Sequence, residues 1–184
     1  VSLTPFAARC LAQRKFRKNT PWRLDLALDR LETAEAAELA QTRYPLEIHM
    51  IGAHDWRHAE YAASISDGAA EALSNYEGDS LVIGVSQLSD AAAKSLSGYK
   101  GQALSLPYLT ELSDVAAESL AKHKGELGLN GLTELSDEAA KLLSKHQDGN
   151  LNLNGLTELT DAAAESLSKH QGKINGQNPK QWAG

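Results

Sequence analysis

The chain repeats one short pattern five times, and this repetition constrains its fold more than any other feature. The pattern reads Leu/Ile-Ser/Thr-Asp-x-Ala-Ala-x-x-Leu, and its Asp stands at positions 67, 90, 114, 137 and 161, spaced 23 or 24 residues apart. A period of this length is typical of arrays in which each unit buries its apolar face only against its neighbours. The sequence therefore predicts a stack of small, equivalent units.

The first half of each unit predicts a short helix. Ser or Thr can cap the first free backbone N–H groups, and Asp in the first turn favours the positive end of the helix dipole. The two Ala and the final Leu then lie three, four and seven residues after the cap, on one face that packs inward. A glycine follows each helix, where we expect a left-handed residue to end it. These glycines are Gly101, Gly125, Gly149 and Gly172.

The second half of each unit alternates apolar and small residues. Examples are Leu104-Ser105-Leu106, Leu127-Gly128-Leu129 and Leu151-Asn152-Leu153. A period of two over so few residues predicts a short strand with one buried edge. Because a helix connects each strand to the next, we expect the strands to pair in parallel.

The combined pattern resembles the leucine-rich-repeat superfamily. Leu-x-Leu-x-x-Leu-x-x-Leu followed by Ser/Thr-Asp is similar to a bacterial-type variant of the cysteine-containing class, L-x-L-x-x-C-x-x-L-T-D. In this chain Leu109, Leu132 and Leu156 stand at the cysteine position. Residues 66–176 carry the resemblance well. It implies an α/β, right-handed solenoid with a short parallel sheet on the concave face and helices on the convex face.

We expect one repeat domain over residues 1–184. The looser matches outside the regular units divide it into five parts: an N-terminal capping helix over 1–23, degenerate repeats over 24–51, an insertion over 52–65, regular repeats over 66–173 and a C-terminal cap over 174–184. An array needs such caps to cover its end layers.

The insertion interrupts the period between the degenerate and the regular units. A strand leucine and the next helix cap lie nine residues apart from Leu104 to Ser113, but 20 apart from Leu46 to Ser66. The surplus contains Trp, Arg and Tyr, the residues that most often anchor interfaces. Insertions in solenoids also tend to lie on one rim and to carry function. The alternative is a spare helix, capped by Asp55, that only packs over the array.

The family resemblance implies a non-catalytic protein that binds a protein or peptide on its concave sheet. We place the site on the strand face and the insertion. The candidate binding residues are Glu47, His49, His54, Asp55, Trp56, Arg57, His58, Tyr61 and Tyr108. Two other interpretations stay open: a structural spacer within a larger protein, and a metal-binding enzyme centred on the histidines of the insertion. Carbohydrate binding on the Asn-rich face lacks the aromatic platform that sugars usually stack on.

Charge and composition exclude several partners. Residues 1–23 carry six basic and no acidic side chains, whereas the rest of the chain holds 12 basic against 24 acidic groups. An acidic body disfavours nucleic acid, which needs a concentrated cationic face. No apolar run is long enough to span a membrane. Cys10 is the only cysteine, which excludes an internal disulfide and leans towards the cytoplasm. We expect a monomer.

Two repeated columns of residues invite metal chemistry, and the histidine column also invites a pH response because histidine titrates near neutrality, but we expect a structural role for both. His123, His146 and His170 are equivalent, with Tyr99 and Tyr76 before them in register, so their rings could form a column. We expect these histidines to act as cations near helix C-termini. The repeated Asp is expected to stabilise helix starts rather than bind calcium, which needs six or more converging oxygens. With no recognisable nucleophile or phosphate loop, we expect no enzyme activity, metal or cofactor.

Overall fold

The computed structural model describes residues 4, 7–8, 24–28, 31–42, 45–50 and 64–182 of the chain, with only the backbone of 24, 25, 27, 28, 49, 50, 181 and 182. Strands and helices alternate in this part, as the repeat predicts. The strands are β1 (Leu24–Leu28), β2 (Leu46–Met50), β3 (Ser80–Gly84), β4 (Ala103–Ser105), β5 (Glu126–Gly128) and β6 (Leu151–Asn152). The helices are α2 (Thr33–Leu39), α3 (Asp67–Ser74), α4 (Asp90–Leu96), α5 (Asp114–Leu120), α6 (Asp137–Leu143), α7 (Asp161–Leu167) and α8 (Pro179–Trp182).

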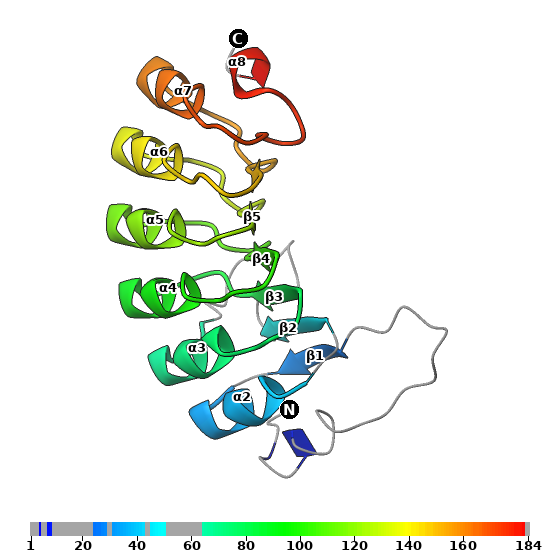
Figure 1. The fold of residues 1–184 in the computed structure, drawn as a ribbon. Helices are drawn as coiled ribbons and strands as arrows, with labels where there is room; N and C mark the ends of the chain where they lie inside the picture. Colours follow the sequence, from blue (N-terminus) through cyan, green and yellow to red (C-terminus); the bar gives the residue numbers. More distant parts are fainter. Residues whose placement is uncertain are drawn as a thin grey trace.

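The six strands form one sheet in the order β1-β2-β3-β4-β5-β6, and every neighbouring pair is parallel. Figure 1 shows the units one above another, with helices α2 to α7 along one side and the strands along the other. The column of helices bows outward, away from the sheet. The prediction of an α/β repeat with parallel strands is therefore confirmed.

The core fills the space between the sheet and the column of helices. From each regular unit it takes two or three strand leucines or their equivalents, together with the Ala pair and the final Leu of the helix, except that α7 contributes only Ala163 of its pair. Leu104, Ala116, Ala117 and Leu120 show this pattern, with exposed fractions of 0–1%. Since each side chain meets equivalent residues above and below, the core is continuous along the stack.

Helices α3 to α7 begin as the sequence predicts. The hydroxyl of Ser66, Ser89, Ser113, Ser136 or Thr160 accepts a hydrogen bond from the backbone N–H three residues later, at 3.0–3.2 Å. Each of these helices has its repeated Asp in the first turn. Helix α2 differs, because Glu32 precedes it and makes no side-chain cap. From Thr33 as the cap, the sequence predicts Ala36 and Ala37 as the Ala pair of this helix. The buried residues are Glu35, Ala36 and Leu39, so the register lies one residue earlier.

Of the four glycines that follow the helices only Gly125 has a positive φ, of 140°, and none of the four ends its helix, so the prediction of a left-handed helix end was wrong. The helices end earlier, at right-handed residues such as Ser97 and Ser144. The glycines stand where neighbouring backbones come close. A Cβ on Gly149 would lie 1.9 Å from the Gly125 carbonyl oxygen, and one on Gly172 would lie 2.1 Å from that of Gly149. Only glycine fits such an approach.

In the family pattern that the sequence resembles, a Cys or Asn stands in the turn after each strand. In this chain a leucine stands at that position. Leu109 and Leu132 are fully buried, and their N–H groups donate to the carbonyls of Leu106 and Leu129, three residues back, at 3.3 Å. Thr110 ties this loop to the preceding unit, because both its N–H and its hydroxyl donate to the Ser86 carbonyl. Side chains contribute further along the chain, where Oδ1 of Asn130 accepts from the Asn154 N–H at 3.2 Å and Oδ1 of Asn175 accepts from the Leu153 N–H at 2.6 Å.

The sheet ends in a tight turn at its C-terminal side. Ile174 bridges to Leu151 and then to Gln177, so the chain folds back on itself after one residue of pairing. Asn175 and Gly176 form this turn with φ angles of 51° and 77°. Helix α8 follows beside α7 at the C-terminal end of the stack (Figure 1). This segment occupies the sheet edge that a further strand would use.

Candidate functional site

The open face of the sheet carries one column of equivalent side chains. Glu47 pairs in register with Val82, Val82 with Ser105, Ser105 with Gly128, and Gly128 with Asn152. These positions alternate with leucines that are 0–1% exposed. The column therefore changes from an acid to small, neutral residues towards the C-terminal end, and its side chains remain partly exposed except at Gly128.

The structure places three of the predicted binding residues. Glu47 is half-buried in the column of the sheet face, and the backbone of His49 pairs with Ala27 and Gly84 in β1 and β3. Tyr108 is half-buried in the loop after β4, where it packs against the core. The predicted residues of the insertion lie outside the described residues. They are His54, Asp55, Trp56, Arg57, His58 and Tyr61.

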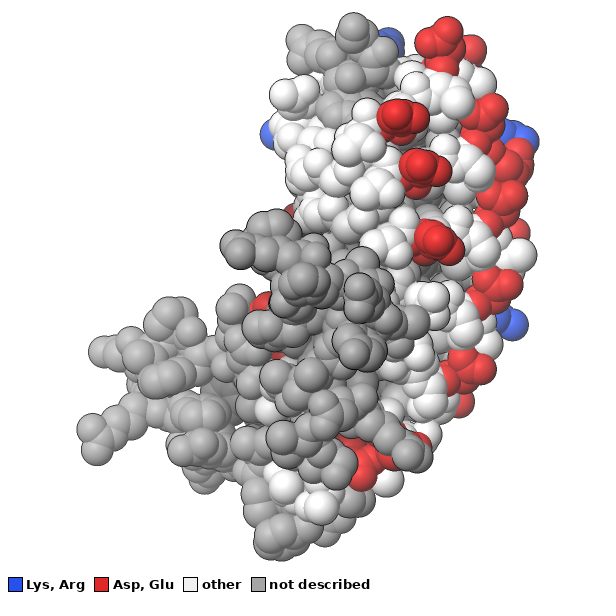
Figure 2. Space-filling view, turned by 180° about the vertical axis from the view of Figure 1, so that it is seen from behind, with Lys and Arg blue, Asp and Glu red and all other residues white. Residues whose placement is uncertain are grey.

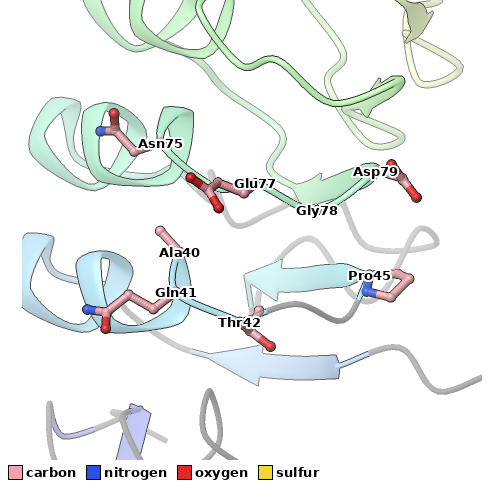
Figure 3. A pocket seen from close by; sticks show the side chains of 8 residues that line it. All are labelled: Ala40, Gln41, Thr42, Pro45, Asn75, Glu77, Gly78 and Asp79. Carbon is pink, nitrogen blue, oxygen red and sulfur yellow. The ribbon is translucent and has the colours of Figure 1, made fainter. Parts of the chain in front are cut away.

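A polar groove of about 580 Å³ lies between the unit of α2 and β2 and the unit of α3 and β3. Its lining includes Gln41, Thr42, Asn75, Glu77 and Asp79 (Figure 3). The groove lies beside the segments that lead from each helix into the next strand. The described side chains that line it offer mainly hydroxyl, amide and carboxylate groups, with Ala40 and Pro45 as the apolar members.

Thr42 holds a position that carries a ring in every later unit. Its N–H donates to the carbonyl of Leu39, the last residue of α2, as the N–H of Tyr76 donates to Leu73 and that of Tyr99 to Leu96. The equivalent residues in the units that follow are His123, His146 and His170. A threonine fills much less space than a ring. The groove thus lies next to Thr42, the position at which the series of stacked ring side chains described below ends.

The rings form a buried column, which we call the ring column: Tyr76, Tyr99, His123, His146 and His170. Ring centres lie 5.9 Å apart between Tyr76 and Tyr99, 5.8 Å between Tyr99 and His123, and 5.9 Å between His146 and His170, with planes within 9° of parallel. The five side chains are 0–5% exposed. The predicted column is confirmed.

The predicted role as helix-end cations was wrong for His123 and His170. Burial, together with the charge of His146, lowers the pKa of these two histidines below the usual 6.5. Burial likewise raises the pKa of Tyr76 to about 12 and that of Tyr99 further. These four rings therefore favour their neutral forms, because a charge on a buried ring loses the solvation of water.

The capping hydroxyls also join neighbouring units, which the sequence reasoning missed. The hydroxyls of Ser89 and Ser113 donate to Oδ1 of Asp67 and Asp90 at 2.5 Å, that of Ser136 to Asp114 at 2.7 Å, and that of Thr160 to Asp137. We call this row the cap ladder. The signal was present in the sequence, since an acid and a hydroxyl recur at one fixed spacing. The repeated Asp thus has a structural role, as expected.

Acidic side chains line the stack in rows. Figure 2 shows them gathered along one edge, with few basic groups between them. Exposed acids recur at the helix starts and again in the loops before the helices. The loop acids are Glu111, Glu134 and Glu158. This face repels phosphate-rich partners.

Within the described part of the chain, no three His, Cys, Asp or Glu side chains gather in a way that could hold a metal ion. No helix there is both long and apolar enough to cross a membrane. Comparison of the sequence with protein-family models found no match, and comparison with curated proteins found none either.

Proposed function

We propose that the chain is a right-handed, leucine-rich-repeat-like solenoid that binds a protein or peptide without catalysis. The site we propose is the open sheet face together with the 52–65 insertion. The observation that carries this proposal is the register of the strands, which aligns Glu47, Val82, Ser105, Gly128 and Asn152 in one row. The outward bow of the helices supports a concave sheet (Figure 1).

The row of the sheet face suits an extended partner better than a small molecule. Its small side chains leave a broad, shallow surface, whereas small-molecule sites are enclosed and mostly apolar. Anchor residues of the kind that dominate interfaces are concentrated in the insertion instead, at Trp56, Arg57 and Tyr61. We therefore expect the insertion to supply most of the affinity for the partner and the sheet face to supply shape complementarity.

A capture experiment from the source lysate tests this proposal. The wild-type chain is compared with the variant Trp56→Ala/Arg57→Ala/Tyr61→Ala and with Ser105→Arg/Asn152→Arg, which adds bulk to the sheet face. The control variant, Val115→Arg/Ala162→Arg, adds the same bulk to exposed helix positions. All four are first matched for helicity and thermal midpoint.

We expect one protein to be captured by the wild type and the control and lost by the other two variants. Capture that survives both site variants would contradict the proposed site. The absence of any specific capture would favour a structural spacer. Metal content in the purified wild-type protein, lost in His54→Ala/His58→Ala, would instead support the metal-binding alternative.

A further inference from the structure

The ring column changes its chemistry half-way along the stack. Tyr76 and Tyr99 occupy it in the units of α3 and α4, and three histidines occupy it in the units of α5, α6 and α7. The Tyr99 hydroxyl donates to the Gly78 carbonyl at 2.6 Å, and Nε2 of His146 lies 2.8 Å from the Gly125 carbonyl oxygen. Both acceptors stand 21 residues earlier in the chain. The imidazole of His146 thus makes the contact that the phenol of Tyr99 makes two units earlier. A phenol stays neutral in acid, whereas an imidazole can take up a proton.

The three histidines differ in what their ring nitrogens meet. Both nitrogens of His146 face carbonyl oxygens, those of Ala121 at 3.3 Å and Gly125 at 2.8 Å, so its imidazolium would have an acceptor for each N–H. Nδ1 of His123 lies 3.1 Å from the Tyr99 carbonyl oxygen, but its Nε2 is buried without a hydrogen-bond partner. The nitrogens of His170 make no hydrogen bond of regular geometry, although the backbone at Gly149, Ser144 and His146 lies close enough to favour its charged form in part.

Protonation affects these rings differently. A neutral imidazole needs one acceptor, whereas the imidazolium carries two N–H donors. A buried donor without an acceptor is costly, and a buried charge without a partner costs more. Protonated His123 would therefore place an unsatisfied donor and a charge inside the stack, and protonated His170 would place a desolvated charge next to the ring of His146.

In the part of the chain that the structure describes, no buried acid next to these rings compensates for such a charge. His123 faces Tyr99 on one side and His146 on the other, and His170 faces His146. The only buried carboxylate of the described residues is that of Glu35, in α2. The ionisable groups next to the three rings in the chain are exposed, where water screens them. They are Lys122, Lys124, Lys145, Asp148, Lys169 and Lys173.

We propose that the three C-terminal units, residues 113–172, form an acid-labile section that opens when His123 or His170 is protonated, while the tyrosine-bearing units over 66–105 stay closed. Each unit contacts only its neighbours in a stack of this kind, so one end can open without the other. Acid would thus control whether β5 and β6, two of the six strands, stay ordered.

Hydrogen exchange read by mass spectrometry on the full chain tests this proposal. Protection is compared at about pH 7.5 and about pH 5.5 after correction for the intrinsic exchange rates, a range in which histidine is the side chain that ordinarily titrates. We expect peptides from 113–172 to lose protection at least tenfold in acid, and peptides from 66–105 to change less than threefold. An equal loss in both sections, or no loss in either, would overturn the proposal.

Two variants assign the effect to the column. The variant His123→Tyr/His146→Tyr/His170→Tyr introduces the ring that the chain itself uses at positions 76 and 99, and we expect it to keep its protection in acid. The matched control, His49→Gln/His54→Gln/His58→Gln, removes the other three histidines, and we expect it to lose protection as the wild type does. Loss of protection in the tyrosine variant together with retained protection in the control would show that the acid sensitivity arises outside the ring column.

An NMR titration of the wild type decides the matter if the tyrosine variant does not fold. We expect the imidazoles of His123 and His170 to titrate below the usual value of 6.5, together with loss of the amide signals of residues 113–172. Titration of these two rings near the usual value with those amides intact would overturn the proposal.

Discussion

Removing one hydroxyl of the cap ladder should weaken two neighbouring units at once. In Ser113→Ala, helix α5 loses the cap on the Ala116 N–H at 3.0 Å, and the unit before it loses the bond to Asp90 at 2.5 Å. The lost cap costs about 1 kcal/mol. The bond to an exposed carboxylate adds about 0.5–1 kcal/mol. We therefore expect the free energy of unfolding to fall by about 1.5–2 kcal/mol, or the thermal midpoint by about 3–8 °C.

The assay is urea unfolding followed by circular dichroism, with Ser144→Ala as the control. The Ser144 hydroxyl donates only to the Lys141 carbonyl of its own helix, at 2.8 Å, so we expect a change within about 0.5 kcal/mol. A double-mutant cycle of Ser113→Ala with Asp90→Ala isolates the contact between units, with an expected coupling of about 0.5–1 kcal/mol. Equal losses in Ser113→Ala and Ser144→Ala, or no coupling in the cycle, would refute the reasoning.

Three further predictions concern the glycines and the histidines. Gly149→Ala should destabilise the chain by about 3 kcal/mol or more, because the new Cβ would lie 1.9 Å from a backbone atom. The control Gly98→Ala should cost little, because the nearest atom to its Cβ would be 3.2 Å away. Equal urea midpoints for the two variants would contradict this prediction. Gly176→Ala should cost about 1–2 kcal/mol, because φ is 77° with no neighbour within 4 Å, and a thermal melt unchanged from wild type would count against strain. Because the pKa of His123 and His170 is lowered in the folded chain, the unfolded chain binds more protons below pH 6.5. The urea midpoint should therefore stay constant above pH 6.5 and fall as the pH drops below it. A urea midpoint that rises towards acid would contradict this prediction.

Much of the fold could be predicted because each unit carries its own local signals. The Ser/Thr cap, the Ala pair and the alternating leucines each have a fixed chemical role, and the five copies confirm one another. The prediction for α2 was wrong by one residue because that helix lacks a hydroxyl at its cap, where Glu32 stands. Where the local signal is missing, the register depends on tertiary packing that the sequence pattern does not contain.

The predictions that failed concern contacts between units. A glycine after a helix predicts a left-handed cap when the helix is considered alone, but Gly149 is required by the backbone of Gly125 in the preceding unit. The histidines likewise look like helix-end cations until stacking buries them. Of the candidate site, the sequence places Glu47 correctly on the sheet face. The register of the strands, which aligns it with Val82 and Ser105, depends on how the units stack.

The cap ladder also determines how a protein of this kind can lengthen. Every Ser or Thr of the ladder uses the carboxylate of the preceding unit, and every Asp from 67 to 137 serves the following unit. A tandem duplication of residues 113–135 would therefore bring one donor and one acceptor, and both would find partners at either junction. A duplication of half that length would leave both without partners. Such a chain can gain or lose whole units with little cost, whereas insertions within a unit are tolerated only outside the helix and the strand.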